Sequence, residues 1–127
     1  MLNLENVKSI YFVGIGGVGM SAAAGIAAQL GFEVRGSDSK AIYDPAKSVL
    51  DSNGIEYTVG YAIENVQETP ADLYIASSGE GLNNPEVAYL TEQELPLHSL
   101  SELLGALAAD KLRIVVAGTH GKSTTAG

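Results

Sequence analysis

The chain has 127 residues, enough for one ordinary domain, and 46% of them are hydrophobic against 17% charged, which excludes a disordered chain. Its formal net charge of −8 argues against a nucleic-acid partner, because such partners require clustered Lys and Arg. The absence of cysteine excludes disulfides, thiolate metal sites and a cysteine nucleophile, and with two histidines a His-rich metal site is not expected. The 15 glycines are about twice the usual share, and their positions direct the interpretation.

Short apolar runs alternate with helical segments along the whole chain. Strands are expected at residues 9–13, 32–36, 55–59, 72–76, 95–98 and 112–117, and helices at residues 17–30, 45–52, 84–92 and 99–109. Gly31 is placed to end the first helix, and Asn84 to cap the third. Asp44 and Pro45 suit the N-cap and the first position of the second helix. Residues 62–71 look like an acidic linker. The alternation predicts an α/β fold, a Rossmann-like parallel sheet with helices on both faces.

Residues 9–32 contain no charged residue, so a membrane span or a signal peptide is an alternative interpretation. Four glycines between Gly14 and Gly19 would interrupt a spanning helix. The stretch also divides into a β-branched and aromatic half and an alanine-rich half, which predicts a strand, a turn and a helix. No membrane partner is expected, and without a targeting segment a cytoplasmic protein is the default expectation.

The first glycine cluster matches the pattern G-x-G-x-x-G at Gly14, Gly16 and Gly19, between an expected strand and an expected helix. Gly14 would permit the tight turn, Gly16 would let a phosphate approach the backbone, and Gly19 would let the helix pack on the sheet. No Lys or Arg lies within the cluster, so backbone N–H groups at the helix N-terminus, and not a cation, are expected to hold a diphosphate. A glycine-rich turn kept for packing alone is the alternative.

The residues alone do not decide which nucleotide this loop binds. Asp38 lies 19 residues after Gly19, at the end of the second expected strand. An acidic residue at about this spacing binds the ribose hydroxyls of NAD in dinucleotide folds. An NAD-binding domain of a dehydrogenase or a regulatory protein is therefore one candidate.

The second glycine cluster follows the last expected strand and has the order of a phosphate-binding loop. Lys122 would reach the terminal phosphates of a nucleotide, and the Ser123 hydroxyl would bind Mg²⁺. The full pattern G-x-x-x-x-G-K-[ST] would require glycine at position 116, where this chain has Val116, so the loop is a variant. His120 is interpreted as a loop residue and not as a catalyst.

The sequence ends at Gly127, before the helix that a phosphate-binding loop requires. We therefore expect the front part of a longer protein. Residues 1–110 would form one binding domain, and residues 111–127 would be the first strand and the phosphate loop of a second, ATP-binding domain.

In this order and about a hundred residues apart, the two loops resemble the start of a Mur ligase. The similarity is carried by residues 14–21 (GIGGVGMS), 36–38 (GSD), 84–87 (NPEV) and 118–125 (GTHGKSTT). Within the family, the chain resembles the branches that join L-alanine, or a recycled tripeptide, to UDP-N-acetylmuramic acid. The resemblance implies an ATP-dependent ligase of peptidoglycan biosynthesis or recycling, in which the muramoyl carboxylate is phosphorylated and an amine then attacks the acyl phosphate.

The resemblance also implies a role for individual residues. Those expected to bind the UDP part of the substrate are Gly14, Ile15, Gly16, Gly17, Val18, Gly19, Met20, Ser21, Ser37, Asp38, Ser77 and Ser78. Those expected to bind ATP are Gly118, Thr119, His120, Gly121, Lys122, Ser123 and Thr124. Lys122 would be catalytic, stabilising charge on the transferring phosphate together with Mg²⁺ at Ser123.

The amine substrate stays undecided. Tyr61 after Gly60 is typical of the recycling branch, whereas the glycine-rich first loop is typical of the alanine branch. A non-catalytic interaction module is a further alternative for the sequence as given, and this fragment alone is expected to hydrolyse no ATP.

Overall fold

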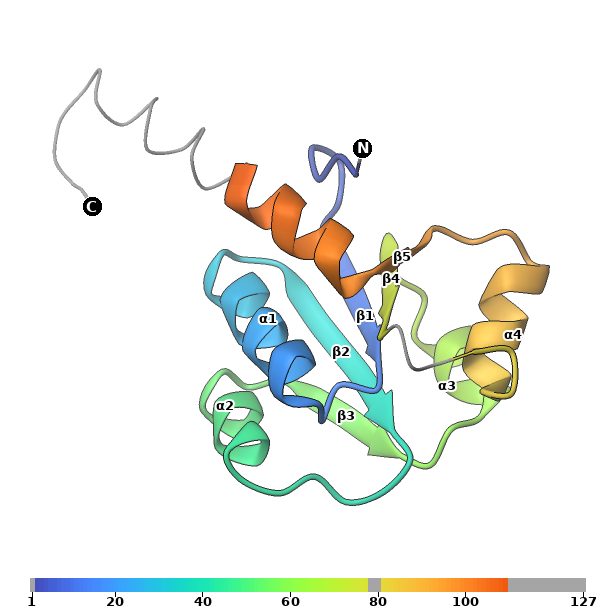
Figure 1. Cartoon of the computed structure of the whole chain (residues 1–127), viewed down its shortest axis with the longest axis horizontal. Coiled ribbons are helices and arrows are strands. Elements are labelled where there is room, and N and C mark those ends of the chain that lie inside the picture. Colours follow the sequence, from blue (N-terminus) through green and yellow to red (C-terminus); the bar gives the residue numbers. More distant parts are fainter. Residues whose placement is uncertain (1, 78–80, 110–127) are drawn as a thin grey trace, which may run out of the picture.

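A computed structural model describes residues 2–77 and 81–109. Over these ranges the chain forms a five-stranded sheet whose strands all run parallel, in the order β3-β2-β1-β4-β5 (Figure 1). The strands are β1 Ser9–Val13, β2 Glu33–Asp38, β3 Glu56–Val59, β4 Leu73–Ala76 and β5 Leu97–Ser99. The α/β fold with a parallel sheet is confirmed, and the predicted sixth strand at residues 112–117 lies outside the described residues.

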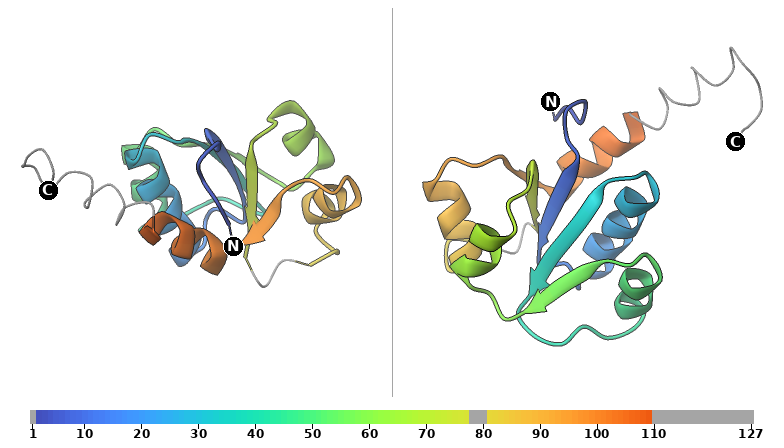
Figure 2. Two further views of the ribbon diagram at one scale, coloured as in Figure 1. Left: turned by 90° about the horizontal axis from the view of Figure 1, so that it is seen from above. Right: turned by 180° about the vertical axis from the view of Figure 1, so that it is seen from behind.

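Helices cover both faces of the sheet, as predicted. They are α1 Val18–Gln29, α2 Ala46–Ser52, α3 Ile63–Glu68 and α4 Pro85–Glu92, followed by helical residues 100–109. The helices α1 and α2 and residues 100–109 lie on one face, and α3 and α4 lie on the other (Figure 2). Successive strand residues point to opposite faces, so β1 and β4 each contribute to two separate cores.

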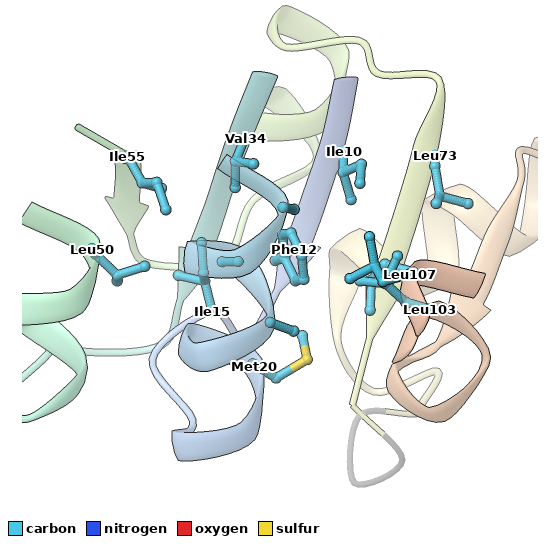
Figure 3. Close-up of a cluster of buried hydrophobic side chains, with 14 of the residues drawn as sticks. Ile10, Phe12, Ile15, Met20, Val34, Leu50, Ile55, Leu73, Leu103 and Leu107 are labelled. Carbon is cyan, nitrogen blue, oxygen red and sulfur yellow. The ribbon is translucent and has the colours of Figure 1, made fainter. Parts of the chain in front are cut away.

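The central strand, β1, shows this alternation most clearly. Ile10 and Phe12 of β1 enter the apolar cluster under α1, whereas Tyr11 and Val13 face α3 and α4. The first cluster is built of hydrocarbon and one thioether, and Figure 3 shows its members reaching from the strands, from α1 and α2 and from residues 100–109. Burial of apolar area on this scale is the main favourable contribution to folding.

The uncharged stretch at residues 9–32 folds as β1, the glycine loop and α1, which is the predicted strand, turn and helix. Among the described residues, no helix is both long enough and apolar enough to span a bilayer. The apolar character of α1 has another cause, because Ala23, Ala24 and Ala27 are buried in the core, and Gly25 leaves room for Val49 of α2. A methyl group on Gly25 would lie 2.9 Å from Val49 Cγ1.

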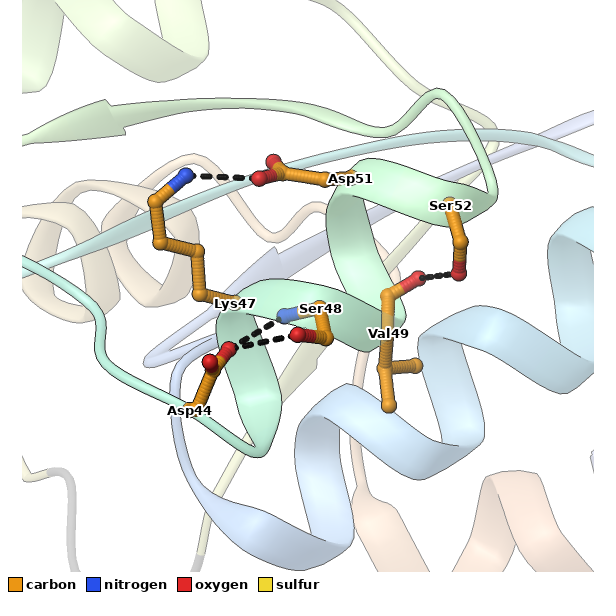
Figure 4. A network of polar contacts seen from close by, with 6 residues as sticks. All are labelled: Asp44, Lys47, Ser48, Val49, Asp51 and Ser52. Carbon is orange, nitrogen blue, oxygen red and sulfur yellow. Dashed lines mark hydrogen bonds and ion pairs between the residues drawn. The ribbon is translucent and has the colours of Figure 1, made fainter.

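Helix ends follow the predicted signals. The Asn84 side chain caps α4 by accepting the N–H groups of Glu86 and Val87 at 2.9 and 3.4 Å. Before α2, Asp44 Oδ1 accepts the N–H and the hydroxyl of Ser48 at 3.0 and 2.6 Å (Figure 4). The prediction of Asp44 as the N-cap of α2 was wrong by one position, because Pro45 occupies the N-cap and Asp44 precedes it.

Two elements differ from the prediction. Residues 62–71 are not a linker, because Val66 is buried and α3 forms around it with its acidic residues outward. The strand expected at residues 32–36 continues to Asp38, since Ser37 and Asp38 pair with Thr58 and Val59 of β3. This extension places Asp38 directly at the carboxyl edge of the sheet.

Candidate functional site

A cleft of about 440 Å³ opens at the carboxyl ends of the strands. From β1 the chain adds β2 and β3 on one side of the sheet and then crosses over to add β4 and β5 on the other side. The strand order therefore changes direction between the neighbouring strands β1 and β4. Open α/β sheets bind ligands at such a switch point. The cleft is lined by Gly14, Gly16, Gly17, Met20, Asp38, Ser39, Lys40, Ala41, Ile42, Tyr43, Tyr61 and Ser77. The glycine loop and the end of the second strand, predicted to form one site, therefore meet here.

The glycine loop after β1 is held through its backbone. Gly14 has a φ of +87°, a left-handed conformation that residues with a side chain rarely adopt. The N–H groups of Gly14 and Ile15 both donate to the carbonyl oxygen of Ser37, at 2.8 and 2.9 Å. The tight turn predicted for Gly14 is confirmed, and it fastens the loop to the end of β2.

Gly36 of β2 makes room for this loop, a role that sequence reasoning missed. A methyl group on Gly36 would lie 2.7 Å from the carbonyl oxygen of Phe12 and 2.7 Å from Ile15 Cδ1. The first of these neighbours is backbone, so it cannot turn aside as a side chain could. The sequence carries one signal for this role, a glycine inside an expected strand. Such a glycine indicates that another group approaches the backbone closely, but it does not identify that group.

The N-terminus of α1 faces the cleft without a side-chain cap. Gly17 is its N-cap, and within the described residues no side chain caps this helix end and its first turn holds no acid. The first-turn N–H groups and the positive end of the helix dipole are therefore left for an anion. The side chains of α1 that were predicted to bind UDP do not share one environment. Val18 is 74% exposed, whereas Met20 and Ser21 are buried.

Gly16 approaches a carboxylate and an aliphatic side chain. Its N–H donates to Asp38 Oδ2 at 2.8 Å, and a methyl group on Gly16 would lie 2.8 Å from that oxygen and 2.9 Å from Ile42 Cγ1. Asp38 Oδ1 accepts the N–H of Ser39 at 2.7 Å. Oδ1 also accepts the hydroxyl of Ser39 at 3.5 Å, whereas among the described donors Oδ2 accepts only the N–H of Gly16, so Oδ2 can still accept a ligand hydroxyl. The space beside Gly16 was expected to admit a phosphate, but the side chains of Asp38 and Ile42 lie next to it.

Gly19 packs against a different neighbour from the one expected. A methyl group there would lie 3.2 Å from Leu100 Cδ2, at the start of the last described helix, and not against a strand. Close helix packing is therefore the reason for glycine at this position, but the partner is a helix.

Among the described residues one cation lines the cleft, although the glycine cluster itself holds no Lys or Arg. Lys40 lies in the loop after β2, outside the glycine cluster, and the fold brings it to the same cleft. Two aromatic residues join it, Tyr43, which is 76% exposed, and Tyr61 from the loop after β3. Ser77 after β4 lines the cleft as predicted, whereas Ser78 lies outside the described residues.

The side chain of Ser37 is directed into the protein. It is fully buried, and its hydroxyl donates to Glu86 Oε1 at 2.6 Å. Ser37 reaches the loop through its backbone carbonyl, as described above. Glu86 is itself fully buried in the first turn of α4, and the sequence indicated this segment only as a capped helix start and as part of the family resemblance, with no role for Glu86 itself.

Tyr11 completes the buried polar group by donating its hydroxyl to Glu86 Oε1 at 3.2 Å. Burial raises the pKa of the Tyr11 phenol far above its ordinary range, and the adjacent Glu86 carboxylate raises this pKa further. The phenol therefore stays protonated and remains a hydrogen-bond donor over the whole physiological pH range.

A larger hollow of about 920 Å³ lies at the opposite edge of the sheet, around Lys8, Ser9 and the C-terminal end of α1 at Leu30 and Gly31. A helix C-terminus presents carbonyl oxygens and the negative end of the dipole, which disfavour an anion. For an anionic nucleotide we therefore favour the smaller cleft, where the electrostatics have the right sign.

The second glycine loop, residues 118–124, lies outside the described residues, so its predicted ATP and Mg²⁺ contacts, Lys122 and Ser123 included, remain predictions. Within the described ranges, the acidic and histidine residues form no group of three or more that could hold a metal ion.

Residues 9–112 match the family described as "Mur ligase family, catalytic domain". Among similar solved structures, one is a murein peptide ligase from Psychrobacter arcticus, 29% identical with a TM-score of 0.70 over 76% of this chain and 20% of that one. A second is the UDP-N-acetylmuramate:L-alanyl-gamma-D-glutamyl-meso-diaminopimelate ligase from Neisseria meningitidis, 32% identical with a TM-score of 0.68 over 74% of this chain and 29% of that one.

A third similar structure is the UDP-N-acetylmuramate-alanine ligase from Thermotoga maritima, 28% identical with a TM-score of 0.68 over 83% of this chain and 23% of that one. The chain thus spans less than a third of the length of each of these three proteins. Both branches singled out from the sequence are represented among them.

Proposed function

Because the chain belongs to the Mur ligase family, we propose that residues 1–110 are the part of an ATP-dependent peptidoglycan ligase that binds UDP-N-acetylmuramic acid. The observation that carries the proposal is the convergence of an uncapped helix N-terminus, a carboxylate and a lysine in one cleft at the switch point of the sheet. Three of the similar structures are named as ligases, two of them acting on UDP-N-acetylmuramate.

Each chemical part of the UDP group has a matching group in the cleft. The diphosphate would lie at the N-terminus of α1, where N–H groups and the dipole favour an anion, with Lys40 supplying a charge-assisted hydrogen bond. The ribose would donate a hydroxyl to Asp38 Oδ2, which accepts only the N–H of Gly16 in the described part of the chain. Tyr43, exposed at the rim, offers an aromatic face on which a base could stack.

The catalytic step is proposed for the whole ligase and not for these residues alone. Residues 111–127 would begin the ATP-binding domain, with Lys122 and a Mg²⁺ ion bound by Ser123 stabilising the charge that develops during phosphoryl transfer. The muramoyl carboxylate would be activated as an acyl phosphate, and an amine would then displace the phosphate. L-Alanine and a recycled tripeptide both remain candidates for the amine.

NAD is the second candidate ligand, and Asp38 at the end of β2 is the observation that favours it. Titration calorimetry of the 127-residue chain with UDP-N-acetylmuramic acid, with UDP and with NAD separates the two. We expect UDP-N-acetylmuramic acid to bind and NAD to bind at least tenfold more weakly, a difference of about 1.4 kcal/mol. Tighter binding of NAD would overturn the proposal.

Lys40 supplies a sharper version of this test. Lys40→Ala should weaken binding of UDP by about tenfold, roughly 1.4 kcal/mol, because a charge-assisted hydrogen bond to phosphate is lost. The matched control is Lys47→Ala, since Lys47 is paired with Asp51 on α2 and does not line the cleft. An equal loss of UDP affinity in both variants would overturn this placement, because the loss would then follow from the change in net charge and not from a contact between Lys40 and the diphosphate.

A further inference from the structure

Glu86 has four hydrogen-bond donors around its carboxylate although it is fully buried and does not line the cleft. Oε1 accepts the hydroxyls of Tyr11 and Ser37, at 3.2 and 2.6 Å. Oε2 accepts the N–H of Ala62 and the Nδ2 of Asn65, at 3.1 and 2.7 Å. The carboxylate is therefore surrounded by donors from β1, from β2, from the N-cap residue of α3 and from α3 itself.

Two of these donors adjoin residues that line the cleft. Ser37 precedes Asp38 in β2, and Ala62 follows Tyr61, so the bonds of Ser37 and Ala62 to Glu86 each lie one residue away from a lining residue. Asn65 extends the connection, because its Nδ2 also donates to the carbonyl oxygen of Gly60 at 2.9 Å.

A second contact joins the same two walls directly. The N–H of Gly60 donates to the carbonyl oxygen of Asp38 at 2.7 Å. The Asp38 carboxylate in turn accepts the N–H of Gly16, in the glycine loop. A continuous set of hydrogen bonds thus runs from Glu86, behind the sheet, to the glycine loop.

A buried carboxylate is a costly way to fill this space. Taking a charge out of water is unfavourable, and well-packed hydrophobic residues at buried ion sites are often as stable or more so. What a carboxylate provides, and an apolar side chain cannot, is four directed contacts that fix the separation of three chain segments. Within the described residues every buried side-chain polar atom has a partner, so this set is complete.

We propose that Glu86 is a positioning residue that sets the shape of the cleft by holding the Tyr61 turn against the Asp38 end of β2. It does so from behind the sheet, without touching the ligand. The effect on ligand affinity rests on the proposed function, whereas the effect on the shape of the cleft does not.

Two variants test this proposal without removing the side chain of Glu86. Glu86→Gln keeps the size of the residue, but its amide supplies one oxygen where the carboxylate supplies two, so at least one pair of donors loses its acceptor. Asn65→Ala removes one donor and the link to Gly60 while leaving Glu86 intact. The matched control is Gln67→Ala, an exposed amide on the same helix.

The first measurement needs no ligand. In amide NMR spectra of the 127-residue chain, both variants should shift the resonances of Ala62 and also of Gly16, and the exchange of the Ala62 amide with solvent should accelerate about tenfold. Gln67→Ala should move neither resonance. Shifts confined to Ala62, with Gly16 unmoved, would mean that the disturbance stays local and would overturn the proposal.

The second measurement is affinity for UDP-N-acetylmuramic acid, taken well below each variant's melting temperature. A positioning residue predicts a loss of about tenfold in Asn65→Ala with the protein fully folded. Unchanged affinity beside a lowered melting temperature would overturn the proposal, because Glu86 would then be only structural. If the unaltered chain binds no UDP ligand at all, the proposed function fails, and the NMR result alone decides the positioning role.

Discussion

The two faces of the sheet are built on different principles. The face under α1, α2 and residues 100–109 is packed with hydrocarbon, from Ile10 and Phe12 to Leu103. The face under α3 and α4 has a smaller apolar cluster and encloses the carboxylate of Glu86 with the hydroxyls of Tyr11 and Ser37. The first arrangement is non-directional and supplies stability, whereas the second is directional and controls where the cleft residues lie.

The largest effect is expected on the apolar face. Phe12 is 0% exposed at the centre of β1, so Phe12→Ala should lower the free energy of unfolding by about 3–5 kcal/mol through lost burial and a cavity. That cost is a large part of the stability of an ordinary domain. Urea denaturation followed by circular dichroism measures it. Leu82→Ala is the control, because Leu82 is largely exposed and its loss should change stability by less than about 0.5 kcal/mol.

An intermediate effect is expected on the polar face. The Ser37 hydroxyl donates to Glu86 and the Ser48 hydroxyl to Asp44, both at 2.6 Å, but only the first pair is buried (Figure 4 shows the second). Ser37→Ala should lower the free energy of unfolding by about 2 kcal/mol, because a buried hydrogen bond to a charged group is lost. Ser48→Ala should cost less than about 0.5 kcal/mol. Equal costs in chemical denaturation would show that burial does not separate the two pairs.

The smallest effect is a pH dependence that belongs to the polar face alone. The pKa of Tyr11 is raised in the folded protein, so above about pH 10 the unfolded chain loses this proton first, and stability falls as pH rises. The loss approaches about 1.4 kcal/mol per pH unit. Tyr11→Phe should cost about 1 kcal/mol at pH 7 but should lack this slope. Parallel stability curves for the two proteins between pH 8 and 11 would contradict the assignment of the slope to Tyr11.

Local patterns predicted the fold well, because its determinants are short in sequence. The alternation in β1, the left-handed glycine after it and the cap at Asn84 each depend on a few neighbouring residues. The assignment of residues 62–71 as a linker failed because one buried residue, Val66, was enough to anchor a short helix against α4.

The site was predicted only where its residues lie within one motif. Glu86 meets Ser37 across 49 positions of sequence and Tyr11 across 75, and no spacing rule indicates such pairs. Lys40 was missed for a related reason, since it lies outside the glycine cluster and only the return of the chain after β2 brings it to the cleft. Conversely, Gly16 was assigned to phosphate alone, although Asp38 and Ile42 occupy the adjoining space.

The location of the ligand is the most direct test of the account. Amide NMR spectra of the 127-residue chain should be recorded while UDP-N-acetylmuramic acid is added. We predict that the amide resonances of Gly17, Val18 and Gly19, at the N-terminus of α1, shift most strongly and saturably. Shifts confined to Gly31 and its neighbours, at the hollow on the opposite edge, or no saturable shift at all, would contradict the assignment of the cleft as the substrate site.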